Sequence, residues 1–472
     1  MPLSDALLPP KYEVRGAWLT TYLNLDWPRT RVRQPQDTLV QQRELLALLD
    51  GLKAIGTNVV LFQVRTRGAV LYPSRYEPWD ICLTGQFGRS PYYDPLAFAV
   101  RACHERGMQL HAWLVTFPLA KNNVAAQHGK QGVHRLQAVA TLRTSEHYML
   151  DPGHPHTADY LANLAAELVH HYAIDGVHLD YVRYPEHTIR YDDSYTYRTY
   201  GRGQAKEDWR RDNVTRVVAR VAEAVRSVRP WVRMSASPVG KYADTPRYSA
   251  GGWNARNAVL QDAVLWLERG YMDMLFPMLY FRDNHFFPFV LDWQERSCGR
   301  TIVPGLGTYM LTERAWPLSD LTRQLHTLRR WGMGHAHFRT QFALDKHKGV
   351  QPTLAWFNAT PALVPPMRWA DSVPPTAPME VVARRDTAYY TLHMRWAEVS
   401  DATPVTYNIY AAPKAGLLPD VRDIRQLVAY GLTEPHYTYA PALPQRLYNS
   451  MAITAVDAYG NESAPTFVHF NF

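Results

Sequence analysis

An alternation of short apolar segments with longer amphipathic segments fills the first 345 residues and limits the folds open to this chain. Eight β-like segments begin near Val14, Val59, Leu110, Val177, Val232, Met274, Ile302 and His335. Between them, stretches such as 39–52, 95–106, 158–171 and 214–228 repeat apolar residues at three and four positions, which indicates helices. Strands that alternate with helices form parallel sheets, and eight repeats make a (β/α)8 barrel. We therefore predict an α/β protein with a TIM barrel over residues 12–365.

Polar and aromatic side chains follow successive predicted strands at the point where each strand ends. These are Arg65, His111, Trp113, Asp180, Ser235, Ser237, Tyr280, Tyr309 and Arg339. A barrel gathers the carboxyl ends of its strands on one face, where its active site lies. We therefore expect these side chains to converge there.

The fourth segment, Asp175-Gly176-Val177-His178-Leu179-Asp180, ends in a carboxylate. Val177 and Leu179 suit a buried strand, whereas a core would have to satisfy His178 and Asp180 with partners. Asp180 is our first catalytic candidate. Its alternative is a structural ion pair with Arg183 or Arg65, and the alternative for His178 is a core histidine with satisfied nitrogens. Asp175 is expected to cap a turn.

The segment resembles the signature of the glycosyl hydrolase-like family related to family 10 glycoside hydrolases. Further motifs of that family follow in order: Arg15-Gly16-Ala17-Trp18, Gln63-Val64-Arg65, Tyr72-Pro73-Ser74, Glu77-Pro78-Trp79, Leu83-Thr84-Gly85, Tyr93-Asp94-Pro95-Leu96 and His111-Ala112-Trp113-Leu114. The resemblance covers roughly residues 12–365. One departure is Val115-Thr116-Phe117-Pro118, where many relatives carry Asn-Pro.

The resemblance implies a glycoside hydrolase that acts on a bacterial polysaccharide. We expect an amino-sugar polymer, peptidoglycan glycan strands first, cleaved internally. It also implies export, to the periplasm or the cell surface. The opening Met1-Pro2-Leu3-Ser4 does not resemble a signal peptide, which is consistent with a cytoplasmic protein or with a leader that was removed. Because the resemblance implies export, we expect the removed leader. The alternative is a non-catalytic carbohydrate-binding or scaffold protein of the cell envelope.

Glycoside hydrolysis ordinarily uses two carboxyl groups. For the second, we rank Glu77 slightly above Glu186. If only Asp180 is suitably placed, an N-acetyl group of the substrate could serve as the internal nucleophile. Predicted substrate contacts are Arg65, Trp79, His111, Trp113, His178, Arg183, Tyr280, Tyr309 and Arg339.

Composition excludes several other classes of function. The net charge of +8 comes from scattered basic residues without a nucleic-acid-binding motif. The three cysteines lack Cys-x-x-Cys spacing, and His335 and His337 lack a neighbouring carboxylate, so we predict no metal and no cofactor. A metal-dependent deacetylase is disfavoured for the same reason. No apolar run is long enough to cross a membrane, so we expect no integral membrane segment.

A Pro-rich stretch at 364–378 predicts a semi-rigid linker to a second domain at 376–472. Alternating segments at 389–396, 406–411 and 450–456 predict a β-sandwich with Trp396 in its core. The run 452–463 resembles the last hairpin of fibronectin type III domains. We expect this domain to act as a spacer or to dock a cell-envelope partner.

Overall fold

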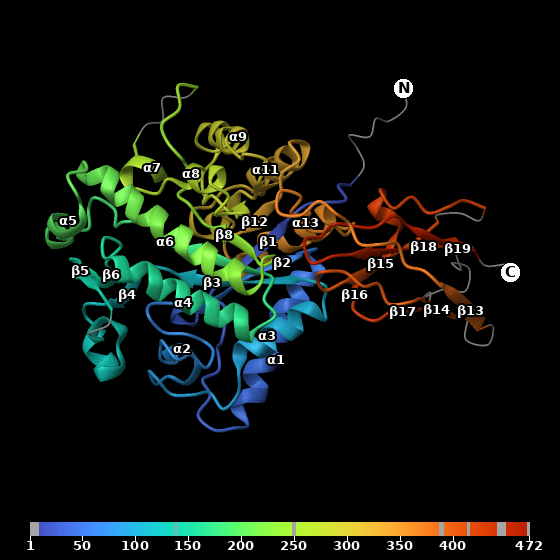
Figure 1. The fold of residues 1–472 in the computed structure, drawn as a ribbon, viewed down its shortest axis with the longest axis horizontal. Coiled ribbons are helices and arrows are strands. Elements are labelled where there is room, and N and C mark those ends of the chain that lie inside the picture. The colour runs from blue at the N-terminus through green and yellow to red at the C-terminus, as the bar shows by residue number, and fades with distance from the viewer. Residues whose placement is uncertain are drawn as a thin grey trace. The chain divides into compact units, whose positions relative to one another are not determined.

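The computed structural model describes residues 9–136, 139–247, 252–386, 391–412, 416–440 and 450–469. The chain divides into two compact units (Figure 1). One is Val14–Phe357, and the other combines Asn358–Phe472 with the N-terminal segment Met1–Glu13. The sequence had placed residues 12–13 and 358–365 with the first domain. They fall in the second unit, where Leu363 exchanges backbone hydrogen bonds with Lys11 and Glu13 and Lys11 pairs with Glu462.

A curled parallel sheet forms the centre of the larger unit, as the alternation of segments predicted. Its strand order is β10-β9-β8-β7-β3-β2-β1-β12-β11. The strands are β1 (Arg15–Leu19), β2 (Val59–Arg65), β3 (Gln109–Val115), β7 (Gly176–Asp180), β8 (Arg233–Ala236), β9 (Met274–Leu275), β10 (Thr301–Ile302), β11 (Gly305–Leu306) and β12 (His335–His337). The two edge strands, β10 and β11, are successive parts of one stretch of chain, 301–306. Val303 N on this stretch bonds Leu275 O, and Pro304 O accepts from Ala336 N. The sheet therefore curls until its two edges meet on the same segment.

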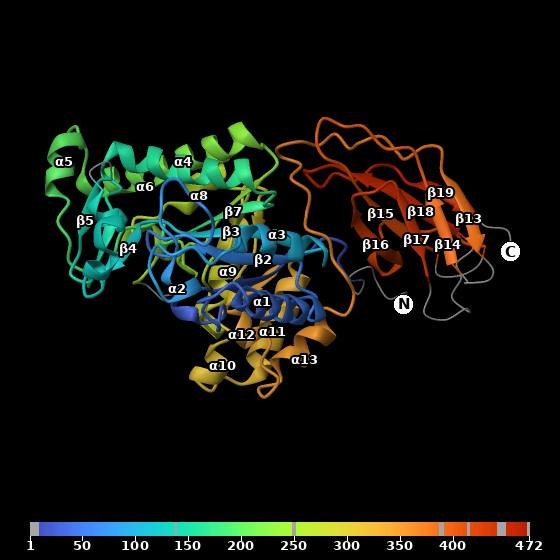
Figure 2. The ribbon, with the colours of Figure 1, turned by 90° about the horizontal axis from the view of Figure 1, so that it is seen from below.

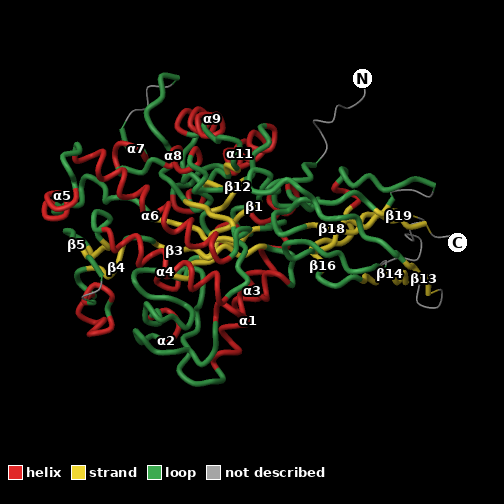
Figure 3. Tube along the Cα trace, viewed as in Figure 1, coloured by secondary structure: helices red, strands yellow, loops and turns green. Residues whose placement is uncertain are grey.

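Helices follow the strands and cover the sheet (Figures 2 and 3). They are α1 (Asp37–Ala54), α2 (Ile81–Thr84), α3 (Pro95–His104), α4 (Pro155–His171), α5 (Ser194–Tyr200), α6 (Lys206–Val228), α7 (Ala255–Ala258), α8 (Ala263–Glu268), α9 (Phe287–Glu295), α10 (Met310–Glu313), α11 (Leu318–Arg330), α12 (Thr340–Ala343) and α13 (Val350–Phe357). Local chemistry sets where they begin. The Asp94 side chain accepts hydrogen bonds from the amides of Leu96 and Ala97, and Pro95 occupies the first turn of α3. The predicted helical stretches correspond to α1, α3, α4 and α6, and the one at 95–106 was expected to run two residues beyond the end of α3.

A small antiparallel sheet, which the sequence did not predict, is inserted between β3 and α4. It consists of β4 (Pro118–Lys121), β5 (Thr141–Arg143) and β6 (His147–Leu150), in the order β4-β6-β5. The 3₁₀ turns η3 (Ala125–Gln131) and η4 (Val133–Arg135) join its strands. Figure 1 shows this sheet beyond the carboxyl end of β3. The motif that departs from the family pattern, Val115–Pro118, leads directly into it.

The second unit is all-β. It contains the sheets β13-β14-β17 and β16-β15-β18-β19. Their strands are β13 (Val382–Asp386), β14 (Thr391–Arg395), β15 (Thr406–Ala411), β16 (Leu427–Leu432), β17 (His436–Tyr439), β18 (Ser450–Val456) and β19 (Thr466–His469). Trp396 is buried and its ring meets that of Tyr407 at 5.0 Å, as expected of a core residue. Met367, within the Pro-rich stretch, is buried as well, so part of that stretch packs on this unit instead of forming a free linker. The fibronectin type III assignment stays a prediction.

Candidate active site

Asp180 ends strand β7, and three donors hold its carboxylate. Oδ1 accepts hydrogen bonds from the Ser237 hydroxyl at 2.9 Å and the Tyr181 amide at 2.8 Å. Oδ2 accepts one bond, from Trp113 Nε1, at 3.1 Å. The residue is only 5% exposed. Burial raises the pKa of Asp180 above its usual value, although all three donors and the charge of Arg183 act in the opposite direction.

The neighbouring strands supply these donors. In the parallel register, Val115 of β3 lies opposite Asp180, and Thr116 N donates to Asp180 O at 2.7 Å. Trp113 therefore reaches Asp180 from β3, and Ser237 reaches it from the end of β8 on the other side. No lysine or arginine of the described ranges forms an ion pair with Asp180. The alternative of a structural ion pair with Arg65 or Arg183 is not what the structure shows.

Arg65 and Glu77 form a separate, fully buried ion pair. Arg65 Nη2 lies 2.7 Å from Glu77 Oε1, and both side chains are 0% exposed. Arg65 Nη1 donates to Thr116 O, and the Tyr160 hydroxyl donates to Glu77 Oε1 at 2.8 Å. Two side chains that are shielded from solvent and saturated with partners cannot meet a sugar. We therefore correct both expectations: Glu77 and Arg65 fasten the loop after β2 to β3.

Glu186 is the more accessible of the two candidates for the second carboxyl group. Its side chain is 43% exposed, and Oε1 lies 3.7 Å from Arg183 Nη2. The Arg183 guanidinium also stacks over Tyr181, 4.8 Å from the ring centre, and faces Trp253 at 5.9 Å. Arg183 and Glu186 therefore belong to an aromatic and charged cluster that begins one residue after Asp180.

His111 and His178 lie in the interior and not at the mouth. Both are fully buried. His178 Nδ1 pairs with Ser235 Oγ at 2.9 Å, and Trp18 Nε1 lies 3.3 Å from His178 Nε2. The His111 ring packs beside Gly176, where a Cβ atom would come within 2.6 Å of it. Burial lowers the pKa of His111 to about 4, so this ring is neutral. The expectation that these histidines contact substrate is corrected, because strand alternation does not reveal how deep in a barrel a side chain points.

Trp79 lies on the loop that follows β2, two residues after Glu77. It is half-buried and lines a hollow of about 410 Å³ together with Glu77 and with Glu167 and His171 of α4. The lining of that hollow does not include Asp180. Its role in binding sugar stays a prediction.

Tyr280 and Tyr309 form an aromatic cluster with Phe338 at the ends of β9, β11 and β12. The Tyr280 ring meets that of Tyr309 at 5.7 Å and that of Phe338 at 5.4 Å. Burial raises the pKa of Tyr280 strongly, and the negative charge of Asp180 adds to that rise. The cluster follows the carboxyl ends of strands that run parallel to β7, and it therefore lies at the same end of the sheet as Asp180.

Arg339 makes an ion pair that the sequence did not predict. Its Nη1 lies 2.6 Å from Asp26 Oδ1, and Asp26 is buried behind it on the loop after β1. Asp26 Oδ2 accepts from the Thr20 amide at 2.9 Å. Arg339 thus fastens two strand-end loops together, which leaves little of its guanidinium for a ligand.

Sequence reasoning missed three further groups at the mouth: Tyr181, Arg67 and Trp253. Tyr181 has a positive φ of 51° and is 41% exposed. That backbone conformation is rare outside glycine and marks a residue held by its surroundings. Arg67 lies two residues after Arg65, directly before the turn at Gly68. That turn was the only feature of the sequence that could have pointed to Arg67.

The described residues hold no cluster of three or more His, Cys, Asp or Glu side chains placed to bind a metal ion. His335 Nδ1 pairs with His337 Nε2 at 3.0 Å in the interior. Among the described helices, none has the length and apolar character needed to cross a membrane.

The chain is similar in sequence to known glycosyl hydrolases. The glycosyl hydrolase-like 10 family model matches residues 13–306. Glycosyl hydrolase DigH of Escherichia coli K12 is 34% identical over 286 residues, covering 57% of this chain and 65% of that protein. The chain thus spans slightly less than two thirds of that relative. Glycosyl hydrolase YngK of Bacillus subtilis 168 is 28% identical over 476 residues, covering 93% of this chain and 91% of that protein.

Two solved structures are similar at low sequence identity. The PgaB (BpsB) glycoside hydrolase domain of Bordetella bronchiseptica has a TM-score of 0.47 at 14% identity, covering 74% of this chain and 98% of that one. The catalytic domain of a β-amylase from Paenibacillus polymyxa has a TM-score of 0.46 at 12% identity, with the same coverage of 74% and 98%. The family model matches more than half of the chain, and the chain belongs to the glycosyl hydrolase-like 10 family.

Proposed function

We propose that this protein is a glycoside hydrolase that cleaves an amino-sugar-containing bacterial polysaccharide, peptidoglycan glycan strands first, with Asp180 as the proton donor. The single observation that carries the proposal is the Asp180 carboxyl group itself. It is buried at the carboxyl end of β7, free of any cationic partner in the described ranges, and its pKa is raised. A general acid needs a carboxyl group whose proton is retained toward neutral pH.

The hydrogen bonds indicate which oxygen carries the proton. Oδ1 already accepts two bonds, from Ser237 and Tyr181, whereas Oδ2 accepts one, from Trp113. The proton therefore belongs on Oδ2, and the donors on Oδ1 fix the plane of the carboxyl group. From Oδ2 it would pass to the glycosidic oxygen as the bond to the anomeric carbon breaks.

The second catalytic group is best supplied by the substrate. Glu77 is buried in its ion pair with Arg65, and the Glu186 carboxylate is paired with Arg183. An N-acetyl carbonyl oxygen that attacks the anomeric carbon would complete the reaction without a second carboxylate. Water would then open the cyclic intermediate, and the Asp180 carboxylate would take up the proton of that water. Glu186 is the competing base, and Glu186→Gln separates the two schemes.

The test measures soluble fragments released from purified peptidoglycan sacculi, either intact or stripped of stem peptides. Wild type, Asp180→Asn and Glu186→Gln are compared. We expect release by wild type and Glu186→Gln, and a loss of about a hundredfold or more in Asp180→Asn, as for a general acid. Equal release by wild type and Asp180→Asn would remove Asp180 from the mechanism. Binding to sacculi without release by any variant would favour the non-catalytic carbohydrate-binding protein.

The location and the second unit are part of the same proposal. A glycan of the cell envelope lies outside the cytoplasm, so we infer that the protein works in the periplasm or at the cell surface. The all-β unit would serve as a spacer or dock an envelope partner. Fractionation of cells that express the native gene tests the location, and recovery in the cytoplasmic fraction alone would contradict it.

A further inference from the structure

A hollow on the flank of the barrel lies between the loop after β2 and helix α4. Its volume is about 410 Å³. Sites for small molecules commonly have volumes of about 300 to 1,000 Å³. The lining includes Pro73, Arg75, Pro78 and Trp79 from the loop, and Glu167 and His171 from α4. Apolar rings and polar side chains therefore face the same small space.

This hollow is separate from the candidate active site. Glu167 and His171 lie in the last turns of α4, which ends at His171. The next strand, β7, begins at Gly176, and Asp180 is its last residue. The α4 side of the hollow therefore lies toward the amino end of β7, whereas Asp180 lies at the carboxyl end. A ligand in the hollow would not occupy the position of the bond that Asp180 is proposed to protonate.

The Glu167 carboxylate fixes the shape of the hollow. It is only 8% exposed, and it accepts hydrogen bonds from Ser74 Oγ at 2.6 Å and from the Arg75 amide at 2.8 Å, one on each oxygen. It has no ion-pair partner among the described residues. A carboxylate has about four lone-pair sites, so both oxygens can still accept a donor from a ligand. The loop and α4 are thus joined around an acceptor that is already held in place.

The donors of the lining are open to a ligand. Arg75 and His171 are exposed, and Trp79 is half-buried. Within the described ranges, the structure gives no acceptor to the Arg75 guanidinium or to Trp79 Nε1. A ligand in the hollow could therefore accept hydrogen bonds from these groups and donate to Glu167 without breaking a bond within the protein.

The charges of the lining balance. Arg75 is opposed by Glu167, and the second acid of the lining, Glu77, is neutralised by its ion pair with Arg65. A buried carboxylate at the wall would repel an acidic ligand, because charges interact strongly where water is excluded. The hollow therefore favours a ligand that is polar and uncharged.

We propose that this hollow is a second, non-catalytic glycan-binding site, which holds a neutral sugar unit of the polymer outside the barrel mouth. The choice of a glycan rests on the proposed function. A sugar ring has an apolar face of C–H groups and an edge of hydroxyl groups. The apolar face matches the Trp79 ring and the two prolines, and the hydroxyl edge matches Arg75 and Glu167. A strand held in the hollow stays close to Asp180 at a high effective concentration.

Hydrogen–deuterium exchange locates the binding of neutral chitotetraose in Asp180→Asn, where turnover does not interfere. We expect the ligand to slow exchange at 73–79 and in the last turns of α4. Calorimetry on the same protein measures the affinity. Trp79→Ala should weaken binding at the hollow roughly fivefold or more, because the stacking face is lost. Arg75→Gln, at an exposed side chain that the fold does not need, should weaken it roughly threefold or more.

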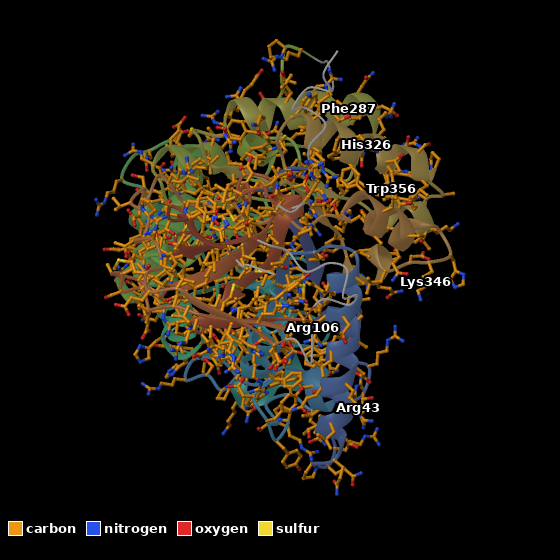
Figure 4. The ribbon with its side chains drawn as sticks, turned by 90° about the vertical axis from the view of Figure 1, so that its right-hand side faces the viewer. Arg43, Arg106, Phe287, His326, Lys346 and Trp356 are labelled. Atoms are coloured by element: carbon orange, nitrogen blue, oxygen red, sulfur yellow. The ribbon has the colours of Figure 1, made fainter. Side chains whose placement is uncertain are left out.

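Two residues labelled in Figure 4 supply matched controls. Trp356 is 70% exposed on α13, and Arg43 is exposed on α1, where its Nε donates to Leu39 O of the same helix. Trp356→Ala and Arg43→Gln should leave both the affinity and the slowed exchange at 73–79 unchanged.

Three results would overturn the inference. They are an absence of chitotetraose binding, unchanged exchange at 73–79 on binding, and slowed exchange there that survives both Trp79→Ala and Arg75→Gln. Its failure is distinct from failure of the proposed function. Binding at the hollow by a protein that releases nothing from sacculi would keep this inference while hydrolysis fails, and release without slowed exchange at 73–79 would do the reverse.

Discussion

Trp113 Nε1 donates a hydrogen bond of 3.1 Å to Asp180 Oδ2, across the pairing of β3 with β7. It is the only hydrogen bond from the described residues to that oxygen, whereas Oδ1 receives two. The indole is itself buried and cannot swing away from the carboxyl group. Trp113 therefore acts on the acidity of Asp180 more directly than on a sugar ring, although sequence reasoning proposed it as a substrate contact.

Trp113→Phe should shift the alkaline limb of the pH–activity profile to higher pH. The hydrogen bond stabilises the Asp180 carboxylate and so lowers its pKa, and its loss leaves the raising effect of burial less opposed. A general acid with a higher pKa stays protonated to a higher pH. Fragment release from stripped sacculi, followed from pH 4 to 9, measures the limb. Trp79→Phe makes the same change on the loop after β2 and should leave the alkaline limb in place. If the limb does not move in Trp113→Phe, the hydrogen bond from Trp113 does not set the acidity of Asp180.

The alternation of segments was sufficient to predict the parallel sheet, because apolar strands and amphipathic helices differ in period and follow one another regularly. The same regularity placed Asp180 at a strand end. It could not separate Asp180 from His178, since residues two apart share one face of a strand whether they lie at the mouth or in the interior. The depth of a side chain depends on the stagger of neighbouring strands, which no local pattern encodes.

Side-chain pairing between loops also lies beyond sequence patterns. Glu77 was proposed as a catalytic group because it follows a strand, yet its carboxylate forms an ion pair with Arg65. Asp26 and Arg339 are 313 residues apart, and only the fold shows that they pair. The inserted sheet β4-β6-β5 was missed because its strands have only three or four residues, too few to show a period.

Asp180 should make the stability of the protein depend on pH in a defined direction. Burial raises its pKa in the folded protein above the unfolded value. The folded state therefore holds the proton more tightly, and this stabilisation is present at low pH and lost as the pH rises from the unfolded pKa through the folded one. The melting temperature of wild type minus that of Asp180→Asn should decrease as the pH is raised from 4 to 7. Asp159→Asn, at an exposed carboxylate of α4, is the control substitution. A constant difference for Asp180→Asn would contradict the raised pKa.

Glu77→Gln tests the structural role of the buried pair. Without the carboxylate, the charge of Arg65 remains buried without its counterion, which costs about 3 to 5 kcal/mol of unfolding free energy. Urea denaturation measures this loss. The control, Glu105→Gln, breaks an exposed pair in which Arg101 Nε lies 3.9 Å from Glu105 Oε1, and it should cost less than about 0.5 kcal/mol. Wild-type stability together with lost hydrolysis in Glu77→Gln would instead restore Glu77 as a catalytic group.

Lys11→Met should destabilise the all-β unit, and the effect should fade in acid. Lys11 Nζ lies 2.5 Å from Glu462 Oε2, and Oε1 of the same carboxylate accepts from Tyr410 at 2.7 Å and Thr454 at 2.6 Å. Burial opposes ionisation of Glu462, but Lys11 and these donors outweigh it and lower its pKa. Stability from this carboxylate is therefore present above the unfolded pKa and lost as the pH falls through the folded one. At pH 7 the loss of the lysine should cost about 3 kcal/mol or more, because Glu462 stays buried and charged.

Hydrogen–deuterium exchange in β15 and β18 locates the effect, and Lys346→Met, at the exposed lysine labelled in Figure 4, is the control. Unchanged exchange in these strands at pH 7 would show that the N-terminal segment does not hold the unit together.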